Sequence, residues 1–338
     1  MKKKIVILAT SLIALGLILC TGAMTMLKWN FKNLSTTKYE TNTHEIAEDF
    51  KDIKITAREA DIVFLPSEDG TCTVTCFEEK NAKHTVSVKD GVLSVTLESE
   101  KKWYQHISIG SHSPKITLSL SKADYAALEI NATTGAVTLP KDFSFASLTV
   151  TQTTGAVLSS ASVTGDTKIR ATTGAVSLSD TSLGALDISV STGAVTLSGI
   201  TAKDMRIQVT TGKTSLANIK AQSLSSDGST GDLVMTDTVL TETLSVERST
   251  GDVRLTQSDA GRIKIQTDTG DVRFEQSDAA EISVETDTGN VTGSFRTAKV
   301  VFASTDTGRV NVPRSTVGGK CEIETDTGDI KIEFPFEG

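Results

Sequence analysis

The chain has 338 residues, of which 38% are hydrophobic and only 5% aromatic, and its formal net charge is −8. A single large globular core normally uses more aromatic side chains, because each one buries a large area. The acidic excess lies in the last third, where residues 227–338 contain 11 basic and 21 acidic residues. Nucleic-acid binding requires clustered Lys and Arg, so this distribution excludes a nucleic-acid partner from the prediction.

Three lysines open the chain and precede an uncharged, mostly apolar run from Ile5 to Leu27. A helix of that length covers about 34 Å, enough to cross a bilayer core. We therefore predict a single-pass anchor over residues 1–27, with the lysines cytoplasmic and the rest of the chain extracellular. The alternative is a signal peptide cleaved after Ala23. Lipoprotein cleavage before Cys20 is disfavoured by Leu19, because a small residue normally precedes that cysteine.

Residues 28–45 are polar and are predicted to form a stalk. Residues 46–125 are predicted to form an irregular β cap over one end of the rod that the later repeats build. The second segment alternates apolar and polar residues, with turn signals at Glu68-Asp69-Gly70 and Asp90-Gly91. It also holds most of the large aromatic residues, namely Phe50, Phe64, Phe77, Trp103 and Tyr104.

The chain contains four cysteines and four histidines. Cys72 and Cys76 lie four residues apart on one predicted strand, about 13 Å, which is too far for a disulfide. These two and Cys321 are predicted to be small core residues. The histidines (His44, His84, His106 and His112) show no zinc or catalytic-triad spacing. No cofactor is therefore predicted.

From residue 126 onward a Thr-Gly pair recurs at spacings of 19 or 20 residues. The eleven glycines are Gly135, Gly155, Gly174, Gly193, Gly212, Gly231, Gly251, Gly270, Gly289, Gly308 and Gly328. Aliphatic residues occur at fixed offsets on both sides of each pair and alternate with polar ones, which indicates strands with one buried face. Units this short bury a face only by stacking. We predict an all-β parallel β-solenoid (β-helix) of about eleven coils over residues 126–338, closed by Phe334-Pro335-Phe336.

The Thr-Gly pair is predicted to be structural, as in Thr269-Gly270, Thr288-Gly289 and Thr307-Gly308. Glycine supplies a corner conformation that a side chain opposes. The threonine is expected to point inward and to hydrogen-bond the next coil.

The residue two before the glycine is Thr or Ser in the first seven units and then Asp268, Asp287, Asp306 and Asp326. The residue after the glycine adds Asp232, Asp252, Asp271 and Asp329. Carboxylates stacked at nearly 5 Å repel one another. Four interpretations stay open: caps for backbone amides, salt bridges between coils, divalent-cation sites, or a recognition strip. Asp268, Asp287, Asp306 and Asp326 are the candidate metal ligands, although the 19- or 20-residue spacing of this repeat differs from that of calcium-binding nonapeptide repeats.

The phrases READIVFLPSEDGTCTVTC, VSVKDGVLSV and ITLSLSKADYAALEI, with the recurrent TTGAV and TDTGDV, resemble a bacterial β-strand-repeat family of unknown function often labelled putative adhesin. The resemblance covers about residues 46–336. It implies a solenoid exposed at the cell envelope, often of Gram-positive bacteria, and it supplies no catalytic residues.

We therefore predict a membrane-anchored, extracellular solenoid that acts as a non-enzymatic interaction module, adhesin-like or envelope-sensing. Its partner is expected to be a cell-envelope polymer or an envelope protein. A cation-binding structural rod is one alternative. A carbohydrate-active β-helix enzyme is another, disfavoured because no unit exceeds 20 residues and so no long loop builds a cleft. Ice binding is disfavoured because the Thr pairs lie at a corner.

Overall fold

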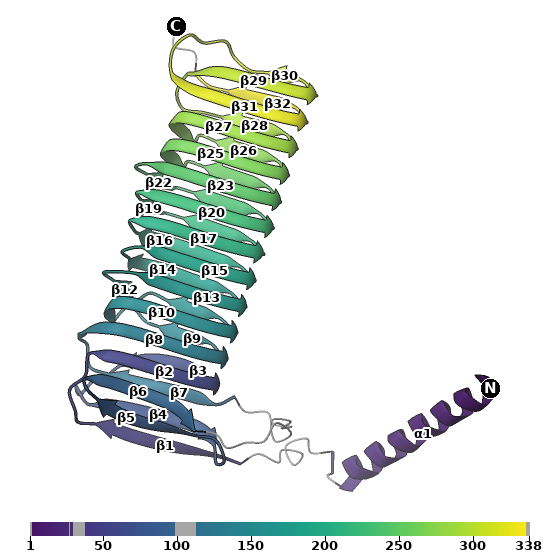
Figure 1. Cartoon of the computed structure of the whole chain (residues 1–338), viewed down its shortest axis with the longest axis vertical. Coiled ribbons are helices and arrows are strands. Elements are labelled where there is room, and N and C mark those ends of the chain that lie inside the picture. Colours follow the sequence, from purple (N-terminus) through teal and green to yellow (C-terminus); the bar gives the residue numbers. More distant parts are fainter. Residues whose placement is uncertain (1, 27, 30–37, 99–112, 336–338) are drawn as a thin grey trace.

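The computed structural model describes residues 2–26, 28–29, 38–98 and 113–335. Within them it has one helix, α1 (Lys2–Met26), and a single continuous sheet of 32 strands wound into a rod (Figure 1). Part of this helix, Ala9–Met26, is long and apolar enough to cross a membrane. Its threonine hydroxyls donate to backbone carbonyls one turn back, as Thr21 does to Leu17 at 2.8 Å. The polar groups of the helix are thus satisfied internally, as a bilayer requires.

The predicted parallel β-solenoid is confirmed. The strands that lead into each Thr-Gly corner are β8 (Asp124–Thr134), β10 (Ser144–Thr154), β13 (Thr167–Thr173), β15 (Leu186–Thr192), β17 (Asp204–Thr211), β20 (Ser223–Thr230), β23 (Thr243–Thr250), β25 (Asp259–Thr269), β27 (Asp278–Thr288), β29 (Lys299–Thr307) and β31 (Gly319–Thr327). The strands that leave it are β9 (Val137–Leu139), β11 (Val157–Ser159), β14 (Val176–Ser182), β16 (Val195–Thr201), β18 (Thr214–Ala217), β21 (Leu233–Thr236), β24 (Val253–Thr256), β26 (Val272–Glu275), β28 (Val291–Ser294), β30 (Val310–Asn311) and β32 (Ile330–Glu333). Short strands β12 (Ser162–Val163), β19 (Lys220–Ala221) and β22 (Val239–Leu240) line the third side.

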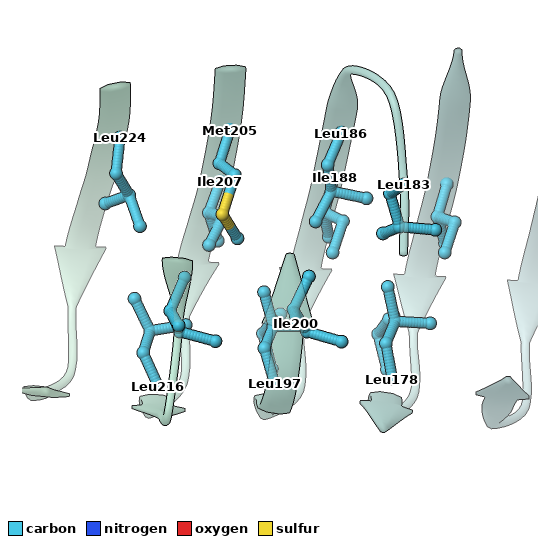
Figure 2. Packing of buried hydrophobic residues seen from close by; sticks show 14 of the residues in the cluster. Leu178, Leu183, Leu186, Ile188, Leu197, Ile200, Met205, Ile207, Leu216 and Leu224 are labelled. Carbon is cyan, nitrogen blue, oxygen red and sulfur yellow. The ribbon is translucent and has the colours of Figure 1, made fainter. Parts of the chain in front are cut away.

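Equivalent residues of neighbouring coils are in register, so that Val253 pairs with Val272 and Val176 with Val195. The inward side chains form columns of aliphatic residues along the axis, and those of adjacent coils touch (Figure 2). Cys321 belongs to this dry interior, where burial raises the pKa of its thiol to about 12. The core is therefore narrow and continuous, which explains the scarcity of aromatic residues.

The sequence predicts an irregular cap, but the cap strands next to the first Thr-Gly coil continue the parallel pairing of the solenoid. Its strands are β1 (Tyr39–Ile46), β2 (Asp52–Glu59), β3 (Asp61–Pro66), β4 (Cys72–Glu79), β5 (Lys83–Lys89), β6 (Val92–Glu98) and β7 (Lys115–Leu120). Strand β2 pairs in parallel with β8, and β3 pairs with β9, with Ala60 in place of the corner glycine. These two strands therefore form a further coil below the first Thr-Gly coil.

Beyond that coil the sheet changes direction. Strands β6 and β7 still run parallel to β2 and β3, but β5, β4 and finally β1 are added antiparallel. The predicted turns are present, with positive φ angles at Gly70, Asp90 and Gly91. Strand β1 begins at Tyr39, so the polar segment between helix and cap ends at residue 38 rather than 45. The division between cap and repeats at residue 126 stays a prediction, because hydrogen-bonded strands cross it.

The last two coils are stacked in the reverse of their chain order. Strand β27 pairs with β31, and β31 pairs with β29. In the same way β32 lies between β28 and β30. The Gly289 amide accordingly donates to the Thr327 carbonyl at 2.9 Å, and the Gly328 amide donates to that of Thr307 at 3.1 Å. The end of the chain is inserted into the rod, and the preceding coil forms the outer edge (Figure 1).

The corner glycines are required by close approach between coils. A Cβ on Gly251, whose φ is +141°, would overlap the carbonyl oxygen of Gly231. The same overlap with the neighbouring glycine exists at Gly270, Gly289 and Gly308. At Gly251 and Gly270 both conformation and space oppose a side chain, whereas at Gly289 and Gly308 the close approach of the neighbouring backbone is sufficient.

Gly251→Ala should lower the free energy of unfolding by more than about 2 kcal/mol, because strained backbone and steric overlap add. The adjacent and exposed Thr250→Ala should change it by less than about 0.5 kcal/mol. Denaturant unfolding of the full chain in detergent measures both. Equal effects of the two replacements would contradict the packing argument.

The reversed order of the last coils predicts which engineered disulfide forms. Ser283 faces Glu322 directly, on strands about 4.8 Å apart, which suits a disulfide. Ser283→Cys with Glu322→Cys should therefore cross-link under mild oxidation. The matched pair Ser283→Cys with Phe302→Cys, which would face each other in a rod stacked in chain order, should not. Peptide mapping without reductant distinguishes the two arrangements.

Candidate functional surface

The Thr-Gly corners form one continuous edge of the rod, here named the Thr-Gly edge, made of each glycine, the two residues before it and the one after it. The threonine is exposed at every one of these corners, from Thr134 to Thr327. Within the described residues none of these threonine side chains makes a hydrogen bond. The prediction that Thr269, Thr288 and Thr307 point inward is therefore wrong. The strand alternation is broken at the corner, where two consecutive residues face solvent.

The inward hydrogen bonds come from one position earlier than the exposed pair, three residues before the glycine. The hydroxyl of Thr325 donates to the Gly289 carbonyl at 3.0 Å, and that of Thr305 donates to the Gly328 carbonyl at 3.0 Å. In an early coil the Gln152 amide donates to the Gly155 carbonyl at 2.5 Å. These side chains satisfy corner carbonyls, whereas the sequence predicted that the neighbouring threonine would bond the next coil's threonine or a corner amide.

The four candidate aspartates lie on this edge and are exposed. Because the last coils are reversed, the order along the rod is Asp268, Asp287, Asp326 and Asp306. None of them forms a hydrogen bond or ion pair with another part of the described chain. A column of like charges without partners is unfavourable for folding.

The second acidic column, directly after the glycines, has a structural role. Each side chain accepts a hydrogen bond from the amide of the equivalent residue in the next coil. Asp252 accepts from the Asp271 amide at 3.0 Å, and Asp271 accepts from the Asn290 amide at 2.8 Å. At the end of the column Asp329 binds the amide and guanidinium of Arg309, which hold the pKa of its carboxyl below the usual value. The amide-capping interpretation therefore holds for this column.

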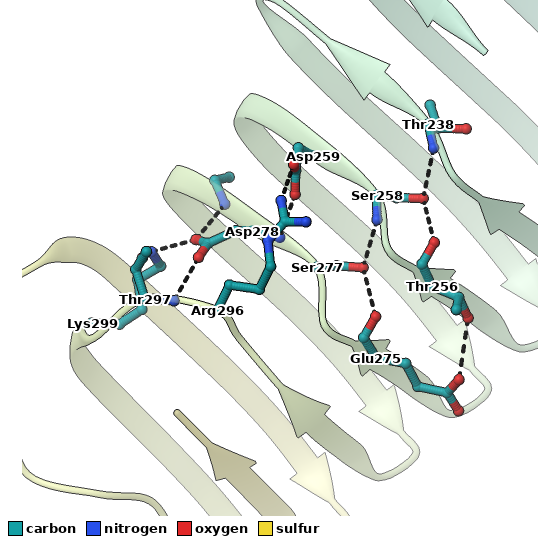
Figure 3. Close-up of polar contacts among 11 residues, drawn as sticks. Thr238, Thr256, Ser258, Asp259, Glu275, Ser277, Asp278, Arg296, Thr297 and Lys299 are labelled. Atoms are coloured by element: carbon teal, nitrogen blue, oxygen red, sulfur yellow. Dashed lines mark hydrogen bonds and ion pairs between the residues drawn. The ribbon is translucent and has the colours of Figure 1, made fainter. Parts of the chain in front are cut away.

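Acidic residues at another corner are also fully partnered (Figure 3). Asp278 accepts from the Thr297 amide at 2.7 Å and pairs with Lys299 at 2.5 Å, and Asp259 pairs with Arg296. Beside them Ser258 and Ser277 bond the coils together through buried hydroxyls. The contrast singles out the four unpartnered aspartates of the Thr-Gly edge.

Metal binding by these aspartates stays a prediction. Three or more His, Cys, Asp or Glu ligand atoms within 4.8 Å of one another occur, among the described residues, only at Cys76, Glu78 and His84 in the cap. This cluster was not predicted from the sequence, because the histidine lies on the strand after the other two residues. A Cys-x-Glu pair followed by a short turn and a histidine was the available signal. Of the other histidines, His106 and His112 lie outside the described residues.

Comparison with protein families gives a match to the model described as Toastrack DUF4097, over residues 50–235 and 218–337. The chain belongs to this family. The match includes both the cap and the repeats, in agreement with the fold. A comparison with the curated proteins finds no match.

Among solved structures, the Toastrack chain is similar to a putative adhesin from Bacteroides fragilis (15% identity, TM-score 0.41, 88% of this chain and 97% of that one). It is also similar to a putative adhesin from Parabacteroides distasonis (14% identity, TM-score 0.37, 88% and 98%). A third is named a putative lipid binding protein, also from Parabacteroides distasonis (14% identity, TM-score 0.35, 88% and 98%). Similarity at this level is too low to transfer a function.

The two acidic columns should respond oppositely to replacement. Asp287→Asn should raise the melting temperature at low salt by about 1 °C, because it removes repulsion, and this gain should vanish at high salt. Asp271→Ala should lower it, because the Asn290 amide loses its acceptor. Thermal unfolding at two salt concentrations measures both.

If Asp287→Asn destabilises the rod as much as Asp271→Ala does, and calcium stabilises only the wild type, the unpartnered column is a cation site instead.

Proposed function

We propose that this Toastrack protein is a membrane-anchored, extracellular interaction module without enzymatic activity, and that the Thr-Gly edge binds basic groups of a cell-envelope polymer or envelope protein. The observation that carries the proposal is the unpartnered column of Asp268, Asp287, Asp326 and Asp306 beside exposed threonines. Folding gains nothing from this column. Stacked coils present its carboxylates at intervals of about 4.8 Å, a spacing that suits an extended ligand.

Charge supports the choice of a basic ligand. Residues 227–338 contain 11 basic and 21 acidic residues, a net of 11 − 21 = −10. Aspartates after the glycines add to the same edge, although their side chains already accept amide hydrogen bonds. A strip of one sign raises the local concentration of oppositely charged groups and speeds their association. The early coils carry Ala or Lys after the glycine, so the ligand is expected at the C-terminal half of the rod.

The proposed location follows from the helix. Three lysines precede the apolar segment and would stay in the cytoplasm. An uncleaved α1 (Lys2–Met26) would then place the whole rod outside the cell. A cleaved signal peptide would also export the rod, but would release it from the membrane.

The binding test uses the full chain in nanodiscs against purified peptidoglycan, teichoic acid and an envelope protein fraction. Replacing all four aspartates by Asn should weaken binding by about tenfold, and binding by the wild type should fall steeply with salt. The matched control removes four exposed charges that lie at, or directly before, the start of strands β8, β13, β17 and β23, away from the Thr-Gly edge, by Asp124→Asn, Asp166→Asn, Asp204→Asn and Glu242→Gln. The control should bind like the wild type.

Equal loss in both variants would show that only net charge matters. Absence of binding to every fraction, or turnover of any polysaccharide substrate, would contradict an interaction module without enzymatic activity.

A further inference from the structure

The cap contains a buried cluster of three side chains of the types that bind metals. Strand β4 places Cys76 and Glu78 on its inner face, and His84 is the second residue of β5, just beyond the turn. Their ligand atoms lie within 4.8 Å of one another. Cys76 is fully buried, and the side chains of Glu78 and His84 are only 1% and 4% exposed. Charged groups are rarely buried this deeply unless they are paired or bind an ion.

Glu78 is held by three donors. Its Oε2 accepts from the His84 amide at 2.6 Å and from His84 Nδ1 at 2.7 Å. Its Oε1 accepts from the Asn42 side-chain amide on strand β1 at 2.7 Å. These bonds fix the carboxylate in place and orient the imidazole ring. Three strands of the cap, β1, β4 and β5, therefore meet at this carboxylate.

The other ring nitrogen of His84 is left without a partner. A carboxylate oxygen only accepts, so the proton in the contact with Glu78 is on Nδ1. The atom Nε2 is buried and makes no hydrogen bond to any described residue. It lies on the far side of the ring from Glu78, so the nitrogen that can share an ion with this carboxylate is Nδ1. An ion there would take the place of the Nδ1 proton, which would move to Nε2.

We propose that Cys76, Glu78 and His84 bind one divalent transition-metal ion, and that Zn²⁺ fits them best. Zinc accepts thiolate, imidazole and carboxylate ligands in one site. Binding replaces the Cys76 thiol proton, which passes to solvent, by a sulfur–metal bond. The thiolate and carboxylate charges then balance the two charges of the ion. Three protein ligands leave one coordination position for a further group.

The ion would join β4 to β5 and stabilise the cap. The cluster lies directly under the turn between these strands, beside the outermost strand β1. Strand β5 pairs only with β6 among the described strands, so an ion that joins it to β4 would add support on its other side. The inference is independent of the function proposed for the four aspartates of the Thr-Gly edge, which lie toward the other end of the rod.

The test uses the full chain in detergent, with a thiol-free reductant, after chelation and dialysis. Added Co²⁺ should give the near-ultraviolet absorption of a cobalt–thiolate bond with one equivalent per chain, and Zn²⁺ should abolish it by displacement. Zinc at a hundredfold excess over Kd should raise the melting temperature by about 5 °C or more. Cys76→Ser and His84→Gln should each weaken Zn²⁺ binding by more than about a hundredfold.

The matched control is Cys72→Ser, which removes a half-buried thiol from the same strand outside the cluster. It should keep the absorption band and the affinity of the wild type. Absence of a cobalt–thiolate band, or a band that persists in Cys76→Ser, would overturn the proposal.

If Cys76→Ser fails to fold, as circular dichroism would reveal, X-ray absorption of zinc-loaded Cys72→Ser protein decides the matter. One sulfur with nitrogen or oxygen neighbours supports the site. A shell of nitrogen and oxygen alone rejects it.

Discussion

The close approach of backbones at the glycine corners is the constraint on which the rest of the rod depends. Each corner glycine except Gly308, which lies on the outermost coil, donates its amide to the threonine carbonyl of the next coil, as Gly155 does to Thr173 and Gly174 does to Thr192, both at 2.9 Å. No side chain fits between these backbones. Because the glycines fix the spacing at one corner, residues at equal offsets stay in register along the entire rod. The aliphatic columns and the exposed edge are both consequences of that register.

The same register gives the Thr-Gly edge columns of equivalent residues. Equivalent positions stack, so a single residue type repeated in the sequence becomes a line on the surface. The position after the glycine joins coils through its side chain, as in Asp271 with Asn290. The position two before it, as in Asp287, contacts solvent only. Two columns of identical residues therefore differ in role because one faces the next amide and the other does not.

The ends of the rod depart from the repeat, and both departures protect edges. At the cap, antiparallel strands cover the first coils. At the other end, strand β31 is placed between β27 and β29, so it has hydrogen-bonded neighbours on both sides. Exposed strand edges promote unwanted pairing, and terminal segments are the first to detach. The proposed metal site lies between two of these antiparallel strands, β4 and β5.

The sequence by itself determined the period, the buried face of each strand and the corner glycines, because these are local features repeated eleven times. It did not determine the order of the last coils, since Val310 and Ile330 fit the same column in the same register. Nor did it predict that Arg248 fills the space left by Ser226 and Gly228 in the preceding coil, where its guanidinium donates to the Ser226 hydroxyl at 2.8 Å.

Only the tertiary structure decided that the corner threonines face solvent and that Cys76, Glu78 and His84 meet. Both depend on where a strand ends and how the next one returns, which residue spacing leaves undetermined. The alternation of apolar and polar residues predicts which face of the sheet a side chain takes within a strand. It does not predict this at a corner or turn, where backbone geometry changes over one or two residues.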